Sequence, residues 1–163
     1  MALKPEQIEK YFEKEFCKRT LEILKSYNGD YDVALLINSM VGLLIVPSED
    51  FFRNNINKGT VLNRIRETSI FNQLEECIEK NTYRQETISP FQLIKHMRNA
   101  VCHARMKIIC NSDEGNLLKN IEKIRFEDYY KYDNEQIAEF KMVVSIDKLK
   151  AFLQVIAENI CNE

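Results

Sequence analysis

Residues 88–105 read ISPFQLIKHMRNAVCHAR, and this stretch contains the clearest helix start in the chain. Ser89 is a favourable N-cap, Pro90 suits the first helical position, and Gln92 completes a capping box with Ser89. Beyond this start, apolar residues recur at helical spacing and define one apolar side. The sequence therefore predicts a helix from Pro90 to about Arg105.

Polar side chains on this predicted helix form the candidate functional site. Asn99 and His103 are one helical turn apart, His96 lies on the same side, and the long Arg98 flanks them. This surface suits the binding of phosphates, although an ordinary solvated helix face would have the same composition. No acidic residue occurs from Thr87 to Ser112, where the cations are Lys95, Arg98, Arg105 and Lys107.

Composition and charge bound the class of protein. The 163 residues are 45% apolar and 29% charged, which predicts one globular domain over residues 1–163 and excludes collagen-like and disordered classes. With a formal net charge of -2, the chain lacks the basic excess of a DNA-coating or membrane-surface protein. No signal peptide is visible, and the apolar run from Val33 to Val46 is shorter than the roughly 20 residues of a membrane span. We therefore expect a cytoplasmic protein without a membrane anchor.

The remaining pattern predicts a mainly α fold. Alternating apolar residues around Ile124 and Val144 predict two strands joined by a tyrosine-rich connection. The expected architecture is a bundle of about five helices, with a small antiparallel β-hairpin at about residues 117–146 inserted before the last helix. Besides the helix described above, helical spacing and caps predict helices at about Pro5 to Tyr27, Asp30 to Pro47, Gly59 to Ile78, and from Asp147 onward.

The segment from Arg98 to His103 resembles the Rx4-6H motif of HEPN domains, and Asn99 stands where that family has a polar residue. The apolar helix from Val33 to Pro47 resembles the central helix of the family. The segments LLIN, GLL and MRNA resemble a plasmid-encoded prokaryotic branch of HEPN proteins. The resemblance covers most of the chain and implies a HEPN-like helical bundle.

The resemblance implies a metal-independent endoribonuclease, in which the 2'-hydroxyl of RNA attacks the adjacent phosphorus and leaves a 2',3'-cyclic phosphate. Arg98 would stabilise the charge of the transition state, and Asn99 would orient the imidazole or bind a phosphate oxygen. His103 would transfer the proton, since an ordinary histidine titrates near ~6.5. The expected reaction uses neither a metal nor a cofactor. Further candidate RNA-binding residues are Lys95, His96, Arg105 and Lys107.

The resemblance also implies partners. Typical members are homodimers whose motif helices face each other across a shared cleft, and some are toxins or defence factors with an antitoxin or a nucleotidyltransferase as partner. In some members the nucleotidyltransferase modifies a tyrosine two residues after the motif histidine. This chain has Arg105 at that position, which argues against that form of regulation.

Two other interpretations of the sequence stay open. A HEPN-like domain can bind nucleotide or RNA without cutting it, and the residues that favour catalysis favour binding as well. Alternatively, the chain is a helical protein-interaction module in which Arg98 and Asn99 only tie down the end of their helix. The three functions differ in whether a phosphate can reach His103 and whether that histidine is needed for turnover.

Overall fold

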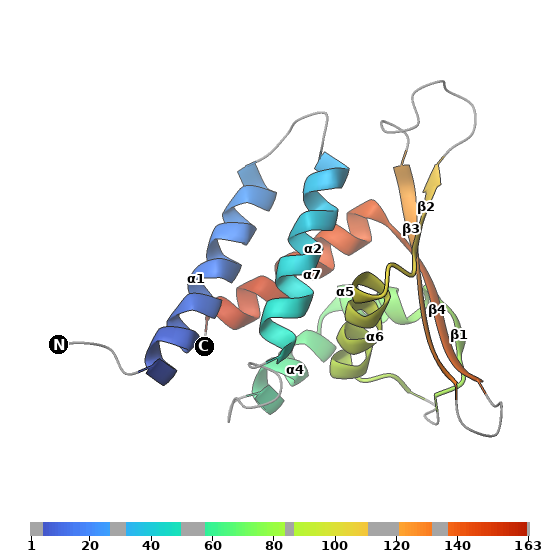
Figure 1. Cartoon of the computed structure of the whole chain (residues 1–163), viewed down its shortest axis with the longest axis horizontal. Coiled ribbons are helices and arrows are strands. Elements are labelled where there is room, and N and C mark those ends of the chain that lie inside the picture. Colours follow the sequence, from blue (N-terminus) through green and yellow to red (C-terminus); the bar gives the residue numbers. More distant parts are fainter. Residues whose placement is uncertain are drawn as a thin grey trace.

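The computed structural model describes residues 5–26, 32–49, 58–83, 87–110, 121–131 and 137–162. In these residues a layer of helices packs on one side of an antiparallel sheet (Figure 1). The helices are α1 (Pro5–Ser26), α2 (Asp32–Glu49), α4 (Lys58–Arg66), α5 (Ser69–Glu75), α6 (Pro90–Cys102) and α7 (Ile146–Cys161). The strands are β1 (Ile78–Asn81), β2 (Met106–Cys110), β3 (Ile121–Lys131) and β4 (Ile137–Ser145).

The sheet has four antiparallel strands in the order β1-β4-β3-β2. The central pair is β3 and β4, whose register runs from Lys123 opposite Ser145 to Lys131 opposite Ile137. Strand β1 is added to β4 at one edge, and β2 is added to β3 at the other. Helix α6 connects these two edge strands in the chain and packs on β3.

The expected fold class, a helical bundle with a small hairpin, is therefore wrong. The hairpin itself exists as β3 and β4, but two further strands extend it to a four-stranded sheet. β1 has only four residues, and its end Ile78 was assigned to a helix because it continues a helical spacing. β2 is a five-residue edge strand whose Ile108 is exposed, so it lacks the alternation that marks a half-buried strand.

Two of the expected helix boundaries also differ from the structure. The predicted third helix is divided into α4 and α5, because the Thr68 side chain accepts a hydrogen bond from the backbone N–H of Phe71 and caps a new helix. Helix α2 continues past Pro47 to Glu49, since a proline in the last turn removes only one helical hydrogen bond. The expected cap Asp30 lies outside the described residues.

The N-cap of the last helix, α7, lies two residues before the predicted one. Ser145 is its N-cap and accepts a hydrogen bond from the backbone N–H of Lys148, whereas Asp147 lies in the first turn. An acidic side chain in the first turn still interacts favourably with the helix dipole. The helix was thus correctly expected here, and only its capping residue was misassigned.

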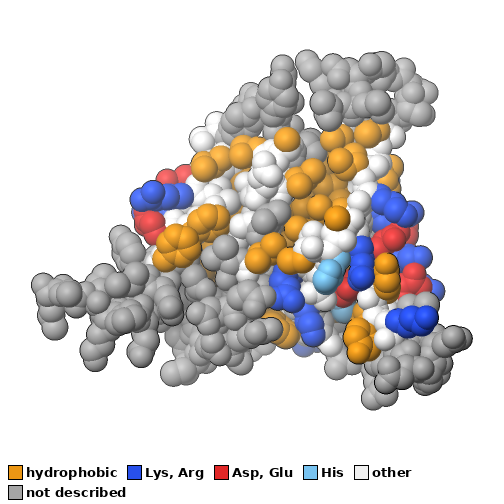
Figure 2. Space-filling view, viewed as in Figure 1, with side chains coloured by type: hydrophobic (Ala, Val, Ile, Leu, Met, Phe, Trp, Pro, Cys, Tyr) orange, Lys and Arg blue, Asp and Glu red, His pale blue; other side chains and the backbone are white. Residues whose placement is uncertain are grey.

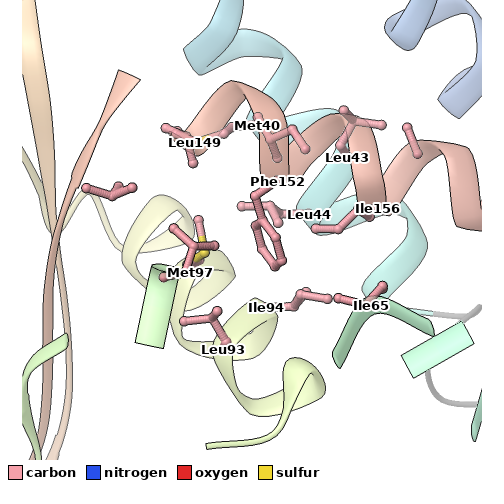
Figure 3. Close-up of a cluster of buried hydrophobic side chains, with 14 of the residues drawn as sticks. Met40, Leu43, Leu44, Ile65, Leu93, Ile94, Met97, Leu149, Phe152 and Ile156 are labelled. Atoms are coloured by element: carbon pink, nitrogen blue, oxygen red, sulfur yellow. The ribbon is translucent and has the colours of Figure 1, made fainter. Parts of the chain in front are cut away.

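One hydrophobic core joins the helices to the inner face of the sheet. In Figure 3 the ring of Phe152 from α7 lies between Leu44 of α2 and Ile94 of α6. All three side chains are at most 1% exposed, and burial of each stabilises the fold by roughly 1.5–3 kcal/mol. Helix α6 is therefore held from both sides, by α2 and α4 on one and by β3 on the other.

Candidate functional site

Helix α6 begins with the capping box that the sequence predicted. The Ser89 hydroxyl accepts a hydrogen bond from the backbone N–H of Gln92 at 3.2 Å, and the Gln92 side chain accepts one from the N–H of Ser89 at 2.8 Å. Pro90 occupies the first turn, where its missing N–H costs nothing. These local bonds fix where the helix starts and so which side chains face the core.

The helix ends just at the motif histidine. His103 is the C-cap residue, and Ala104 follows with a φ of 52°, in the left-handed region that usually requires glycine. The backbone N–H of Ala104 donates to the carbonyl of Val101, and the N–H of Arg105 donates to the carbonyl of Ala100. This pair of bonds is a Schellman motif, which turns the chain sharply from α6 into β2.

This helix end leaves the side chain of His103 exposed to solvent. No residue in the described part of the chain forms a hydrogen bond or an ion pair with its imidazole. A histidine in this position is accessible to a substrate and can exchange protons with it. The structure therefore places His103 at the surface, directly at the end of α6.

Beside the helix lies a buried carboxylate, Asp128 of β3, which is 4% exposed. Its Oδ2 accepts hydrogen bonds from Nδ1 of His96 at 2.8 Å and from Nδ2 of Asn99 at 3.0 Å. Because an ionised carboxylate can only accept, His96 must carry its proton on Nδ1 in this arrangement. Asp128 thus ties two side chains of α6, one turn apart, to the middle of the sheet.

Asn99, held by Asp128, in turn holds Arg98 by hydrogen bonds. The side-chain oxygen of Asn99 accepts hydrogen bonds from Nη2 of Arg98 at 3.0 Å and from Nε at 3.3 Å. Asn99 therefore donates to an anion with its nitrogen and accepts from a cation with its oxygen. Arg98, Asn99, Asp128 and His96 form one connected network, which we call the Asp128 network.

Arg105, which directly precedes β2, also contacts Asp128. Its guanidinium lies 3.6 Å from Oδ1 of Asp128, donates to the backbone carbonyl of Tyr129 at 3.1 Å, and lies 3.7 Å from the centre of the Tyr129 ring. Both oxygens of Asp128 therefore face donors or cations. Arg105 is held by the sheet rather than projecting into solvent, which lowers its availability to a phosphate.

The pKa of Asp128 lies below its ordinary value of 3.8. Burial alone would raise the pKa, because it disfavours the charged form. The hydrogen bonds from His96 and Asn99, together with the charges of His96 and Arg105, outweigh burial and lower it. Asp128 is consequently a carboxylate at neutral pH, which the donor pattern around it requires.

His96 does not lie on the exposed side of the helix, and this part of the prediction is wrong. His96 is 6% exposed. Its ring stacks on that of Phe140, with 4.6 Å between the ring centres, and its centre lies 4.5 Å from the centre of the Tyr83 ring. The helical spacing placed it beside Asn99, which is correct, but Asp128 of β3 and Phe140 of β4 cover that side. His96 therefore acts inside the protein, on Asp128.

The sheet also reduces the positive charge expected along the segment 87–112. Lys107 lies 3.6 Å from the carboxylate of Glu127, and Arg105 is close to Asp128. Lys95 is exposed on α6. Figure 2 shows histidine atoms between Lys and Arg side chains on this face, with acidic side chains next to them. The local positive surface is therefore smaller than the sequence alone indicated.

Asp128 is the site residue that sequence reasoning missed. Ile124, Phe126 and Asp128 alternate along β3 and are all buried, so the acid occupies a core-facing position of the strand. The strand was expected to end at Phe126, and the tyrosines after it were assigned to a connection. An acidic residue in phase with two buried apolar ones was the available signal.

The described residues contain neither a metal-binding cluster nor a helix suited to a membrane. Within the described residues, no three or more His, Cys, Asp or Glu side chains are grouped so that they could hold a metal ion. Over the same residues, no helix combines the length and the apolar character that crossing a membrane requires.

Comparison with known proteins identifies the family. The profile of the family described as HEPN pEK499 p136 matches residues 1–163, and the chain therefore belongs to this plasmid-associated family of HEPN proteins. The expected resemblance is confirmed. No curated protein and no solved structure matches the chain. Membership places the protein among those with RNA-related, nuclease or nucleotide-binding functions.

Proposed function

We propose that this HEPN protein is a metal-independent endoribonuclease whose catalytic residues are Arg98 and His103, with Asn99 holding Arg98. One observation carries the proposal. The guanidinium of Arg98 is held by an anchored side chain, and an exposed histidine follows at the end of the same helix. A fixed cation and an accessible group that can transfer protons are what cleavage of RNA by its own 2'-hydroxyl needs.

The residues divide the reaction between them. The 2'-oxygen forms a bond to phosphorus as its proton passes to a base, and the bond from phosphorus to the 5'-oxygen breaks as that oxygen receives a proton. The products are a 2',3'-cyclic phosphate and a 5'-hydroxyl. His103 transfers protons, and Arg98 neutralises the charge that accumulates on the phosphate oxygens. Lys95 and Lys107 would contribute to binding of the RNA backbone.

The spacing of the two residues favours a homodimer. Arg98 and His103 are five positions apart, which corresponds to about 7.5 Å along a helix axis. Two copies that meet through α6 would bring Arg98 of one subunit near His103 of the other.

The experiment that tests the function is incubation of mixed-sequence RNA with the wild type and with His103→Ala in the presence of a chelator. We expect the wild type to give fragments with 2',3'-cyclic phosphate ends, and His103→Ala to lower the rate at least ~100-fold, the scale of a lost acid or base. Asn162→Ala is the matched control, since Asn162 is the exposed C-cap of α7. If wild type and His103→Ala both bind RNA but neither cuts it, the protein is an RNA-binding domain and not a ribonuclease.

A role as a toxin or defence factor belongs to the same proposal, with an antitoxin as the partner that restrains the enzyme. Induced expression of the wild type should then stop growth of a bacterial host and degrade its RNA, whereas His103→Ala should do neither. Normal growth with abundant wild-type protein that cuts RNA when purified would contradict the toxin role without affecting the enzymatic one.

A further inference from the structure

Asp128 has contacts that a merely structural carboxylate on this strand would not need. Its neighbour on the outer face, Glu127, has an ordinary exposed partner, Lys107. Asp128 instead points into the protein and binds two donors of α6 with one oxygen, 29 and 32 positions away in the chain. One of these donors is Asn99, which directly follows the motif arginine.

The bond from Asn99 to Asp128 fixes which way the amide of Asn99 faces. An asparagine amide can occupy its place in two orientations, with nitrogen and oxygen exchanged. A carboxylate accepts only, so the nitrogen must face Asp128, and the oxygen then faces Arg98. In the opposite orientation the nitrogen would meet the guanidinium, where two donors cannot bond.

We propose that Asp128 is a positioning residue of the ribonuclease site: its carboxylate orients the amide of Asn99, which in turn holds the guanidinium of Arg98 at the phosphate. This inference rests on the function proposed above. Asp128, a β-strand residue outside the motif, thereby acts in the reaction without touching the substrate.

Asp128 is itself held in place by His96 and Arg105. His96 occupies the same oxygen as Asn99, and the stacking of its ring on Phe140 keeps its Nδ1 aimed at the carboxylate. Arg105 lies near the other oxygen. The carboxylate can therefore neither rotate freely nor lose its charge at neutral pH, and the orientation of Asn99 stays fixed.

The decisive variant is Asp128→Asn, which keeps the shape of the side chain but removes the charge. An amide at this position accepts with one atom and donates with the other, so it no longer imposes one orientation on Asn99. We expect kcat for RNA cleavage to fall roughly 10- to 100-fold, the scale of a misplaced catalytic group, with little change in KM. Glu127→Gln, a neighbouring loss of charge on the outer face, should leave kcat unchanged.

A double-mutant cycle separates positioning through Asn99 from a general effect on the fold. Because Asp128 acts through Asn99, adding Asp128→Asn to Asn99→Ala should lower kcat no further. Rates are compared per folded protein, from the unfolding curve of each variant. If Asp128→Asn unfolds at the assay temperature, Asp128→Glu keeps the charge and displaces it by one methylene, and the same fall in kcat is expected.

Each outcome is distinguishable from failure of the proposed function. A wild type that cuts RNA, with full kcat in Asp128→Asn or with independent effects in the cycle, overturns the positioning role alone. A wild type that binds RNA but does not cut it overturns the ribonuclease, and the role of Asp128 in the reaction falls with it. In that case the missing cleavage is seen in the wild type, before any variant is compared.

Discussion

Asp128 is a buried carboxylate that the surrounding donors keep ionised. Its pKa is lower in the folded protein than its ordinary value of 3.8, despite the burial that opposes it. In the unfolded chain the same group takes up a proton near that ordinary value. Between the two pKa values the unfolded state therefore binds more protons, and acid favours unfolding.

The sign of this linkage predicts how stability changes with pH. The contribution of Asp128 is fully present above pH 3.8 and is lost as the pH falls from there through the lower, folded pKa. At pH 7 Asp128→Asn should reduce the free energy of unfolding by roughly 1.5–3 kcal/mol, the range for hydrogen bonds to a charged group. The difference between the two proteins should shrink as the pH is lowered below 3.8.

Urea unfolding of both proteins over this pH range measures the effect. Glu127→Gln serves as the control for a change in net charge, because it removes a carboxylate from the outer face of the same strand. A difference between wild type and Asp128→Asn that stays constant down to the lowest pH would mean that folding does not lower the pKa of Asp128.

At the scale of one element, the end of α6 is strained where it turns toward β2. Ala104 adopts a left-handed backbone conformation that costs a residue with a Cβ atom energy and costs glycine little. The Schellman hydrogen bonds on either side of it keep the residue there. The strain lies directly after His103.

Ala104→Gly should therefore stabilise the protein, by about 0.5–1 kcal/mol in the free energy of unfolding. Ala151→Gly in the interior of α7 is the matched control, and it should destabilise the protein by about 1 kcal/mol. Urea unfolding of both variants gives the two signs. If Ala104→Gly destabilised the protein as much as Ala151→Gly, the helix would not end in the left-handed turn described.

Elements with local signals could be predicted from the sequence. The capping box of Ser89 and Gln92 acts within one turn, so the start of α6 was correct to the residue. The edge strand β1 could not be found in this way, because its hydrogen bonds reach β4 about 60 positions later in the chain. A four-residue segment carries too little alternation to reveal such a pairing.

The residues of the candidate site likewise include some that local sequence predicted and some that it did not. Arg98, Asn99 and His103 were recognised because they share one helix, and their relative order on it follows from helical spacing alone. Asp128 and the burial of His96 depend on β3 lying against that helix, which is a tertiary contact. The sequence pattern of α6 alone therefore identified the motif, whereas Asp128, which holds Asn99, lies on β3.

At the scale of the whole molecule, the proposed dimer makes a prediction that separates a shared site from two independent ones. Arg98→Ala and His103→Ala should each be inactive alone. If each site takes Arg98 from one subunit and His103 from the other, a mixed dimer contains one intact site and one doubly altered site. After random exchange of subunits, an equal mixture should recover about a quarter of the wild-type activity.

Mixing the two variants after mild denaturation and refolding, followed by the RNA cleavage assay, measures this recovery. Each variant taken through the same treatment alone is the control. No recovery, from subunits that demonstrably exchange, would mean that Arg98 and His103 act within the same chain.

The order of the strands has a consequence for synthesis of the protein on the ribosome. Helix α6 and the two edge strands β1 and β2 are translated before β3 and β4, which pair with those edges and fill the centre of the sheet. When the motif histidine is added to the growing chain, the carboxylate that anchors Asn99 is still 25 positions from being made. A growing chain therefore carries the motif without its support, and the Asp128 network can assemble only after β3 has been made.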